Sequence, residues 1–123
     1  MAAATINLTV DQGSSKTILF TISADGSPQN LTGFDARLQV RRTYGDTRAE
    51  LNCTLQNSKL QITDALAGKI SLVLSPSDTS SIRMTNKDDD QLEAVYDLEL
   101  VSAAGQVTKP VRGTFTLIRE VTR

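Results

Sequence analysis

The last thirty residues, 94–123, constrain the fold most, because apolar and polar side chains alternate there along two long runs. In the first run Tyr96, Leu98 and Leu100 share one face, while Asp97 and Glu99 share the other. A period of two is the signature of a half-buried β-strand. We therefore expect a strand over residues 94–102, with the tyrosine and leucines facing the core.

The second run, residues 107–121, predicts the antiparallel partner of this strand. Its expected inward face holds Val107, Val111, Gly113, Phe115, Leu117 and Val121. Between the runs, Gly105 can adopt the positive φ that short hairpin turns require. Pro110 cannot donate a ladder hydrogen bond and Gly113 has no side chain to pack, so we expect a bulge or bend between them.

Six earlier segments show the same alternation, each bounded by turn-forming residues. They predict strands over residues 5–10, 16–23, 35–42, 50–55, 60–63 and 69–74. One stretch differs, because Ser75, Pro76 and Asp78 form the start of a helix, expected near residues 76–84 with Ile82 as its anchor. About eight short strands in one domain, residues 1–123, predict an all-β sandwich with one short helix.

Composition excludes several classes of protein. The 13 basic and 14 acidic residues are interspersed, so we expect no nucleic-acid partner, which would need a concentrated basic patch. No apolar run approaches a membrane span, and MAAATINLTV lacks the basic and apolar regions of a secretory signal. Cys53 is the single cysteine, which favours synthesis in a reducing cytoplasm.

The residues offer little for catalysis. Without histidine the chain lacks the commonest general base and zinc ligand, so we expect no enzyme, cofactor, metal or small-molecule substrate. Cys53 lies on an inward strand face and is expected to be buried. The acidic run from Asp88 to Asp90 leaves calcium binding open, although a solvated loop is favoured because the glycine and later glutamate of a calcium loop are missing.

Two groups of residues are candidates for contact with other proteins. Arg41, Arg42 and Arg48 flank one loop and either bind an acidic neighbour or are simply exposed. The second group lies on two uncharged or unusually apolar strand segments near the termini, residues 5–10 and 114–122. Edge strands are often paired or protected, so we expect at least one segment to contact another chain through Thr5, Asn7, Thr9, Thr116, Ile118 or Glu120.

Two sets of motifs resemble a known family. The first set is an Asp11-Gln12-Gly13 turn, the run from Asn30 to Phe34, and the strand from Ala36 to Arg41. The second is the strand from Tyr96 to Leu100, then Val107, the run from Val111 to Thr114, and the end from Glu120 to Arg123. Their order resembles small virion proteins of tailed bacteriophages. It is also similar to the N-terminal immunoglobulin-like sandwich of phage baseplate upper proteins.

The resemblance implies an immunoglobulin-like sandwich and a non-enzymatic structural role in a virion made in the host cytoplasm. We expect a tail or baseplate adaptor between the tail core and fibres or an adjacent ring, with other virion proteins as partners in a symmetric assembly. In baseplate proteins further domains follow the sandwich, whereas this sequence ends at Arg123, which favours a stand-alone adaptor. The alternatives are a capsid decoration protein and a carbohydrate- or host-surface-binding module.

Overall fold

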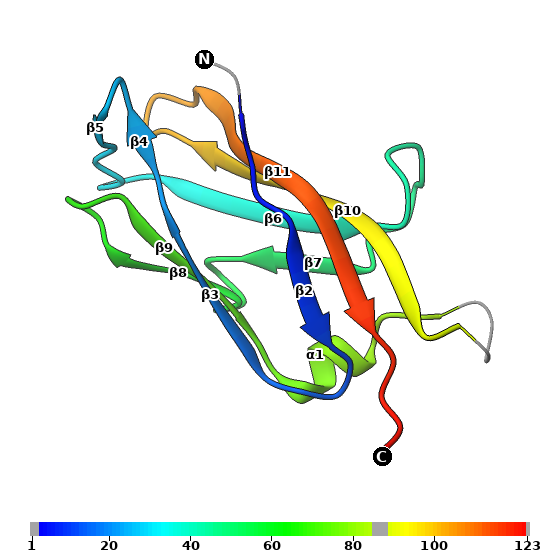
Figure 1. The fold of residues 1–123 in the computed structure, drawn as a ribbon. Coiled ribbons are helices and arrows are strands. Elements are labelled where there is room, and N and C mark those ends of the chain that lie inside the picture. Colours follow the sequence, from blue (N-terminus) through cyan, green and yellow to red (C-terminus); the bar gives the residue numbers. More distant parts are fainter. Residues whose placement is uncertain (1–2, 85–88, 123) are drawn as a thin grey trace.

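The C-terminal hairpin forms the centre of the larger of two sheets (Figure 1). The computed structural model describes residues 3–84 and 89–122. In the hairpin, β10 (Gln91–Val101) pairs antiparallel with β11 (Val107–Ile118). On the other side of β10 lie β6 (Asp35–Arg41) and then β7 (Leu51–Thr54), both antiparallel to their neighbours. On the other side of β11 lie β1 (Ala4–Thr5) and β2 (Leu8–Asp11), both parallel to it.

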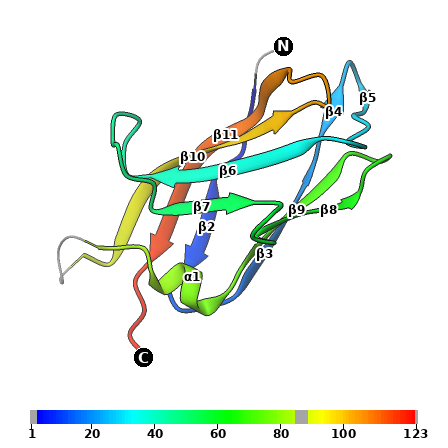
Figure 2. The same ribbon diagram turned by 180° about the vertical axis from the view of Figure 1, so that it is seen from behind.

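The smaller sheet has three antiparallel strands in the order β3 (Lys16–Thr21), β9 (Lys69–Leu74) and β8 (Leu60–Asp64). A short hairpin of β4 (Ser23–Ala24) and β5 (Ser27–Pro28) extends the end of β3. The two sheets face each other as two layers (Figure 2), and α1 (Pro76–Ser80) connects β9 to the larger sheet.

One hydrophobic core fills the space between the layers, as the alternating patterns predict. Fully covered side chains come from both sheets: Phe20, Leu38, Cys53, Ile70, Leu72, Leu98, Phe115 and Leu117. Leu98 and Phe115 are both 0% exposed, which confirms the inward face assigned to the hairpin. The strand order and the packed layers give an immunoglobulin-like β-sandwich.

The helix confirms one prediction and corrects another. Ser75 Oγ accepts a hydrogen bond from the Asp78 N–H at 3.1 Å, and Asp78 Oδ2 accepts one from the Ser75 N–H at 2.8 Å, forming a capping box. The helix ends at Ser80, however, and does not reach Met84. Ser81 Oγ donates to the Asp78 carbonyl, a local side-chain bond that competes with further helical turns. Ile82 is buried, as expected of the anchor.

The bulge includes Pro110 and lies just before the predicted position between Pro110 and Gly113. The register of β10 with β11 shifts between the pair Leu98–Val111 and the pair Leu100–Thr108. An extra residue in β11 moves the preceding side chains to the opposite face, which explains why Val107 is 51% exposed instead of inward. Val121 is also exposed, because β11 ends at Ile118.

The N-terminal strand is broken in two, which the unbroken alternation of residues 5–10 did not predict. Between β1 and β2, Ile6 is 38% exposed and its carbonyl lies over Gly113 of β11. The Tyr96 hydroxyl donates a hydrogen bond to this carbonyl at 2.6 Å. Asn7 Oδ1 accepts the Thr114 N–H at 3.1 Å. A side chain at position 113 would overlap the Ile6 carbonyl, so Gly113 makes this close crossing possible.

Substitution of Gly113 by alanine is expected to lower the free energy of unfolding by about 1–3 kcal/mol, the usual cost of overpacking. Because the added methyl meets backbone atoms, the N-terminal segment must move, and amide exchange should rise first in β1 and β2. Gly45→Ala is the matched control, since its added methyl would meet nothing within 4 Å. Equal denaturant midpoints for the two variants would contradict the role given to Gly113.

Cys53 is fully buried, and burial first, then the charge of Asp78, raises the pKa of its thiol to about 12. Burial also raises the pKa of Tyr96 to about 12. We expect the Cys53 thiol to react at least about tenfold more slowly in the folded than in the unfolded chain, measured with a chromogenic thiol reagent. Equal rates would contradict the burial.

The same two groups predict a loss of stability at high pH. Their folded-state pKa values lie above the ordinary values of 9.0 and 10.0, so the unfolded chain releases protons first as the pH rises. The free energy of unfolding should therefore fall progressively between pH 9 and pH 12. Cys53→Ala should flatten the lower part of this decline, whereas Tyr96→Phe should flatten the upper part.

Candidate functional site: the outer face of the larger sheet

The outer face of the six-stranded sheet gathers charged side chains from three neighbouring strands. Cross-strand pairing places Asp97 of β10 beside Gln39 of β6 and Arg112 of β11. Glu99 of β10 lies beside Arg37 of β6 in the same way. These side chains share a face because successive residues of a strand point to opposite sides, and the inward positions are apolar.

Charges of opposite sign are interleaved on this face. Arg37 forms an ion pair with Glu99, and Lys109 Nζ lies 3.6 Å from Asp97 Oδ2 and 3.8 Å from Glu99 Oε2. Exposed pairs of this kind contribute little stability, commonly about 0–1 kcal/mol each. Their pattern has more value for recognition, since a mixed charge pattern selects a partner with the complementary pattern.

A hollow of about 750 Å³ lies on the same face. Its lining includes Gln39, Arg41, Tyr44, Asp97, Glu99, Lys109 and Arg112. Tyr44 comes from the loop after β6, and its side chain is 80% exposed. An exposed tyrosine beside charged groups offers a large contact area at low conformational cost, as protein interfaces commonly use.

The loop that carries Tyr44 is held by a buried carboxylate. The Glu50 side chain is only 2% exposed, and three arginines converge on its Oε2 atom: Arg83 at 3.3 Å, Arg48 at 3.6 Å and Arg42 at 3.9 Å. Glu50 Oε1 also accepts the backbone N–H of Arg83 at 3.3 Å. Arg42 in turn donates to the Arg83 carbonyl. These contacts join both ends of the loop to the segment after the helix.

The pKa of Glu50 reflects two opposing effects. Burial by itself would raise it, but the hydrogen bonds from Arg83 and the charges of Arg83 and Arg42 hold the pKa below its ordinary value of 4.5. Glu50 is therefore ionised at neutral pH. Its negative charge neutralises part of the arginine cluster, which leaves less positive charge for an external acidic partner.

The three predicted arginines therefore have different roles. Arg42 and Arg48 are directed to Glu50 within the chain. Arg41 lies on the outer face, where it donates to Gln39 Oε1 at 2.7 Å and to the Asp46 carbonyl at 3.0 Å. Only Arg41 of the three lines the hollow. Neither Glu50 nor Tyr44 was identified from the sequence. The position of Glu50 close in sequence to three arginines could have indicated the ion pairs that it forms.

The second predicted group is brought together, since β2 pairs with β11. Thr9 lies opposite Thr116, and Ile118 lies opposite Asp11, while Glu120 donates its backbone N–H to Gln12 Oε1 at 3.2 Å. Thr5 and Thr9 are exposed, whereas Asn7 uses its side chain within the chain. Because β11 has strand partners on both sides, it cannot accept a further strand over the paired residues.

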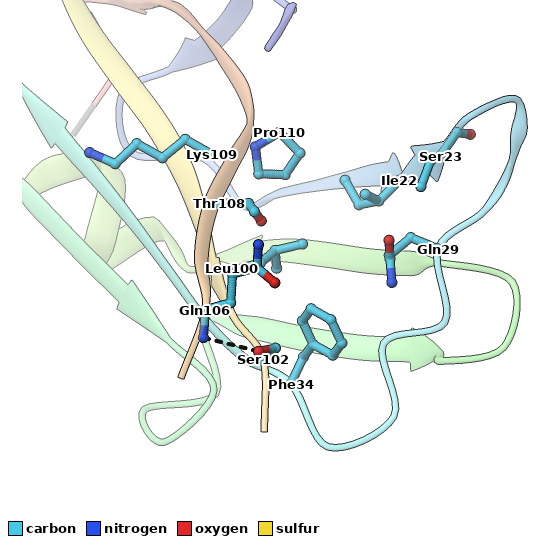
Figure 3. Close-up of a pocket in the computed structure, with 11 residues that line it drawn as sticks. Ile22, Ser23, Gln29, Phe34, Leu100, Ser102, Gln106, Thr108, Lys109 and Pro110 are labelled. Atoms are coloured by element: carbon cyan, nitrogen blue, oxygen red, sulfur yellow. Dashed lines mark hydrogen bonds between the residues drawn. The ribbon is translucent and has the colours of Figure 1, made fainter. Parts of the chain in front are cut away.

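Two remaining features do not form a site for chemistry. Of the acidic run, Asp88 lies outside the described residues, while the carbonyls of Asp89 and Asp90 accept hydrogen bonds from Arg119. Among the described residues no group of three potential metal ligands occurs. A second cavity of about 360 Å³ lies beside the β10–β11 turn (Figure 3), lined by Phe34, Leu100 and Pro110 with polar side chains such as Gln29 and Gln106.

We expect Glu50→Gln to lower the free energy of unfolding at pH 7 by about 1–3 kcal/mol, because the arginines lose a charged acceptor. A depressed folded-state pKa adds stability above the unfolded pKa, and this contribution is lost as the pH falls through the folded value. The difference between wild type and variant should therefore shrink below about pH 4.5. Glu93→Gln, an exposed carboxylate on β10, is the control. A pH-independent difference would contradict the account.

Over the described residues no helix is long and apolar enough to cross a membrane. No curated protein matches the sequence. Among solved structures, the chain is similar to the N-terminal domain of phage TP901-1 ORF48, at 17% identity and a TM-score of 0.44, covering 98% of this chain and 99% of that one. It is also similar to murine CRIg, at 13% identity, a TM-score of 0.41 and coverage of 93% and 92%.

A further similar structure is a VGSC beta subunit, at 12% identity and a TM-score of 0.45, covering 94% of this chain and 92% of that one. The family model described as the BppU N-terminal domain matches residues 2–89, which is more than half of the chain. This agrees with the resemblance to phage baseplate upper proteins that the sequence motifs gave. The chain therefore belongs to the BppU N-terminal domain family, and with it to the structural components of the phage baseplate.

Proposed function

We propose that this chain is an adaptor of the baseplate, joining the tail core to fibres or to an adjacent ring. The observation that carries the proposal is the outer face of the six-stranded sheet, where Tyr44 and an alternating set of charges surround one hollow. The action is docking without chemistry. Many modest contacts, repeated by the symmetry of the particle, hold the neighbour in place.

The structure of this face favours a protein neighbour. Its ion pairs are exposed and adjustable, so a partner with complementary charges can form new pairs without leaving buried charges unsatisfied. Glu50 and its arginines hold the loop that presents Tyr44, which limits the conformational freedom lost on binding. The partners we propose are other virion proteins, with neither nucleic acid nor a small-molecule substrate.

The two alternative functions gain less support from the structure. Sugar-binding modules usually present aromatic platforms, and among the five aromatic residues only Tyr44 is exposed. Phe20, Tyr96 and Phe115 are in the core, and Phe34 is partly buried. No feature of the described residues favours a capsid decoration role over a baseplate role. The family assignment, in contrast, concerns the baseplate.

The test is incorporation of variants into particles of a phage that lacks the gene and is supplied with the chain in trans. Tyr44→Ala and Arg112→Glu should each reduce the amount of chain in purified particles by about tenfold or more, as expected for residues central to an interface. Both residues are exposed, so the isolated variants should unfold like wild type.

Matched controls lie on the opposite side of the sandwich. Leu66→Ala removes an apolar side chain that is 73% exposed, and Lys69→Glu reverses an exposed charge on β9. Both control variants should be incorporated at the wild-type level. Equal incorporation of all four variants would contradict docking through this face, and localisation of the chain on the capsid by electron microscopy would contradict the baseplate adaptor.

A further inference from the structure

Three of the four sheet edges in the described chain carry recognisable protection against strand addition. The edge of β7 is covered by Asn57, whose side chain accepts the Thr54 N–H at 3.0 Å and donates to the Asn52 carbonyl at 2.9 Å. The β1–β2 edge is interrupted at residues 6 and 7. The edge of β8 has a register irregularity between Ile62 and Asp64. Natural sheets use such devices to prevent pairing with other chains.

The fourth edge, β3, has none of these devices. Its ladder with β9 is regular over six residues, from Lys16–Leu74 to Thr21–Lys69, and Lys16 at one end is its only charged residue. In many sandwiches of this class an N-terminal strand covers the corresponding edge. Here the N-terminal residues pair with β11 instead, which leaves β3 at the border of the smaller sheet (Figure 1).

The direction of the free backbone groups follows from the ladder. Beyond β3, the Ile22 N–H donates to the Gly68 carbonyl at 2.8 Å, which continues the same register. In an antiparallel ladder, alternate residues direct both N–H and C=O toward the same neighbour. Even-numbered residues of β3 therefore face β9, while Thr17, Leu19 and Thr21 direct their backbone groups to the open side. All three are exposed, and Leu19 is 54% exposed.

We propose that β3 pairs antiparallel with β3 of a second copy of this chain, about a twofold axis through Leu19. In this register Leu19 lies opposite Leu19 of the other copy, and Thr17 lies opposite Thr21. The open N–H and C=O groups of these three residues then form hydrogen bonds with the C=O and N–H groups of the opposite residues in the other copy. Two three-stranded sheets become one continuous six-stranded sheet.

The sequence of β3 suits pairing with itself. The two Lys16 residues lie at opposite ends of the paired strands, so no like charges meet across the axis. The two exposed Leu19 side chains become neighbours on the outer face of the joined sheet, where opposite residues have Cβ atoms about 4.5–5.5 Å apart. Ile18, which is partly buried at the border of the core, is covered further by the other strand. Each chain has one β3, so the pairing closes as a dimer.

A second copy fits this edge better than a foreign strand. The outward residues Thr17, Leu19 and Thr21 read the same in both directions, so an antiparallel copy places threonine opposite threonine and leucine opposite leucine. The pairing uses the smaller sheet and leaves the outer face of the larger sheet free for other virion proteins. It therefore does not depend on the proposed adaptor function, and the experiments on the two surfaces can fail separately.

The test uses single cysteines on the full chain under a mild oxidant. In the proposed register the two Leu19 Cα atoms lie about 5.5 Å apart, within reach of a disulfide, so Leu19→Cys should form covalent dimers. Two Thr17 residues lie about 14 Å apart, four residue steps along the strands, so Thr17→Cys alone should not. A mixture of Thr17→Cys and Thr21→Cys chains should form the mixed dimer.

Wild type is the baseline, because its only cysteine is buried. Thr63→Cys, an exposed position on β8, is the control for random collision. Leu19→Cys should cross-link at least about tenfold faster than this control, reflecting a preformed close pair. Equal rates, faster self-linking of Thr17→Cys, or no cross-linking at any position would overturn the proposal. Sedimentation over a concentration series should show a wild-type dimer that Leu19→Pro abolishes, and a purely monomeric wild type would also overturn it.

Discussion

The structure depends on one close backbone crossing, in which the Ile6 carbonyl lies over Gly113 and accepts the Tyr96 hydroxyl. This contact fixes where the N-terminal segment joins the larger sheet and where it must break. It also decides which sheet that segment belongs to. Because β1 and β2 pair with β11, they cover that edge of the larger sheet. Within the described chain no N-terminal strand then covers β3, which remains an edge strand of the smaller sheet. The open β3 edge is a consequence of this allocation.

The sequence predicted the parts of the fold that depend on alternation. Leu98, Phe115 and Cys53 were placed in the core from their strand positions alone, and all are fully buried. The capping box at Ser75 was visible because its residue types and spacing are local. Such features need no knowledge of what lies opposite them, since a period of two or a helix start is complete within a few residues.

The errors arose where a distant partner decides the outcome. The alternation from residue 5 to residue 10 is unbroken, yet Gly113 and Tyr96, about a hundred residues later, interrupt the strand. The exposure of Val107 follows from the extra residue of β11 between Thr108 and Val111, because simple alternation counted across a bulge assigns the preceding residues to the wrong face. For the site, the sequence did not indicate that Arg42 and Arg48 pair with Glu50, because the position of the Glu50 side chain is set by the fold. Arg41, in contrast, lies on the expected surface.

The pairing of the first strands with the last also affects how the chain acquires its structure. Asn7 and Thr114 are joined by a hydrogen bond although 107 residues separate them. Contacts of such long sequence separation slow folding, because a large loop must close before they form. On the ribosome, the larger sheet cannot be completed until residue 118 has emerged, since Phe115–Ile118 provide the partner for β2. A chain still being synthesised therefore lacks the complete larger sheet, and with it the finished form of the outer face that we propose for docking.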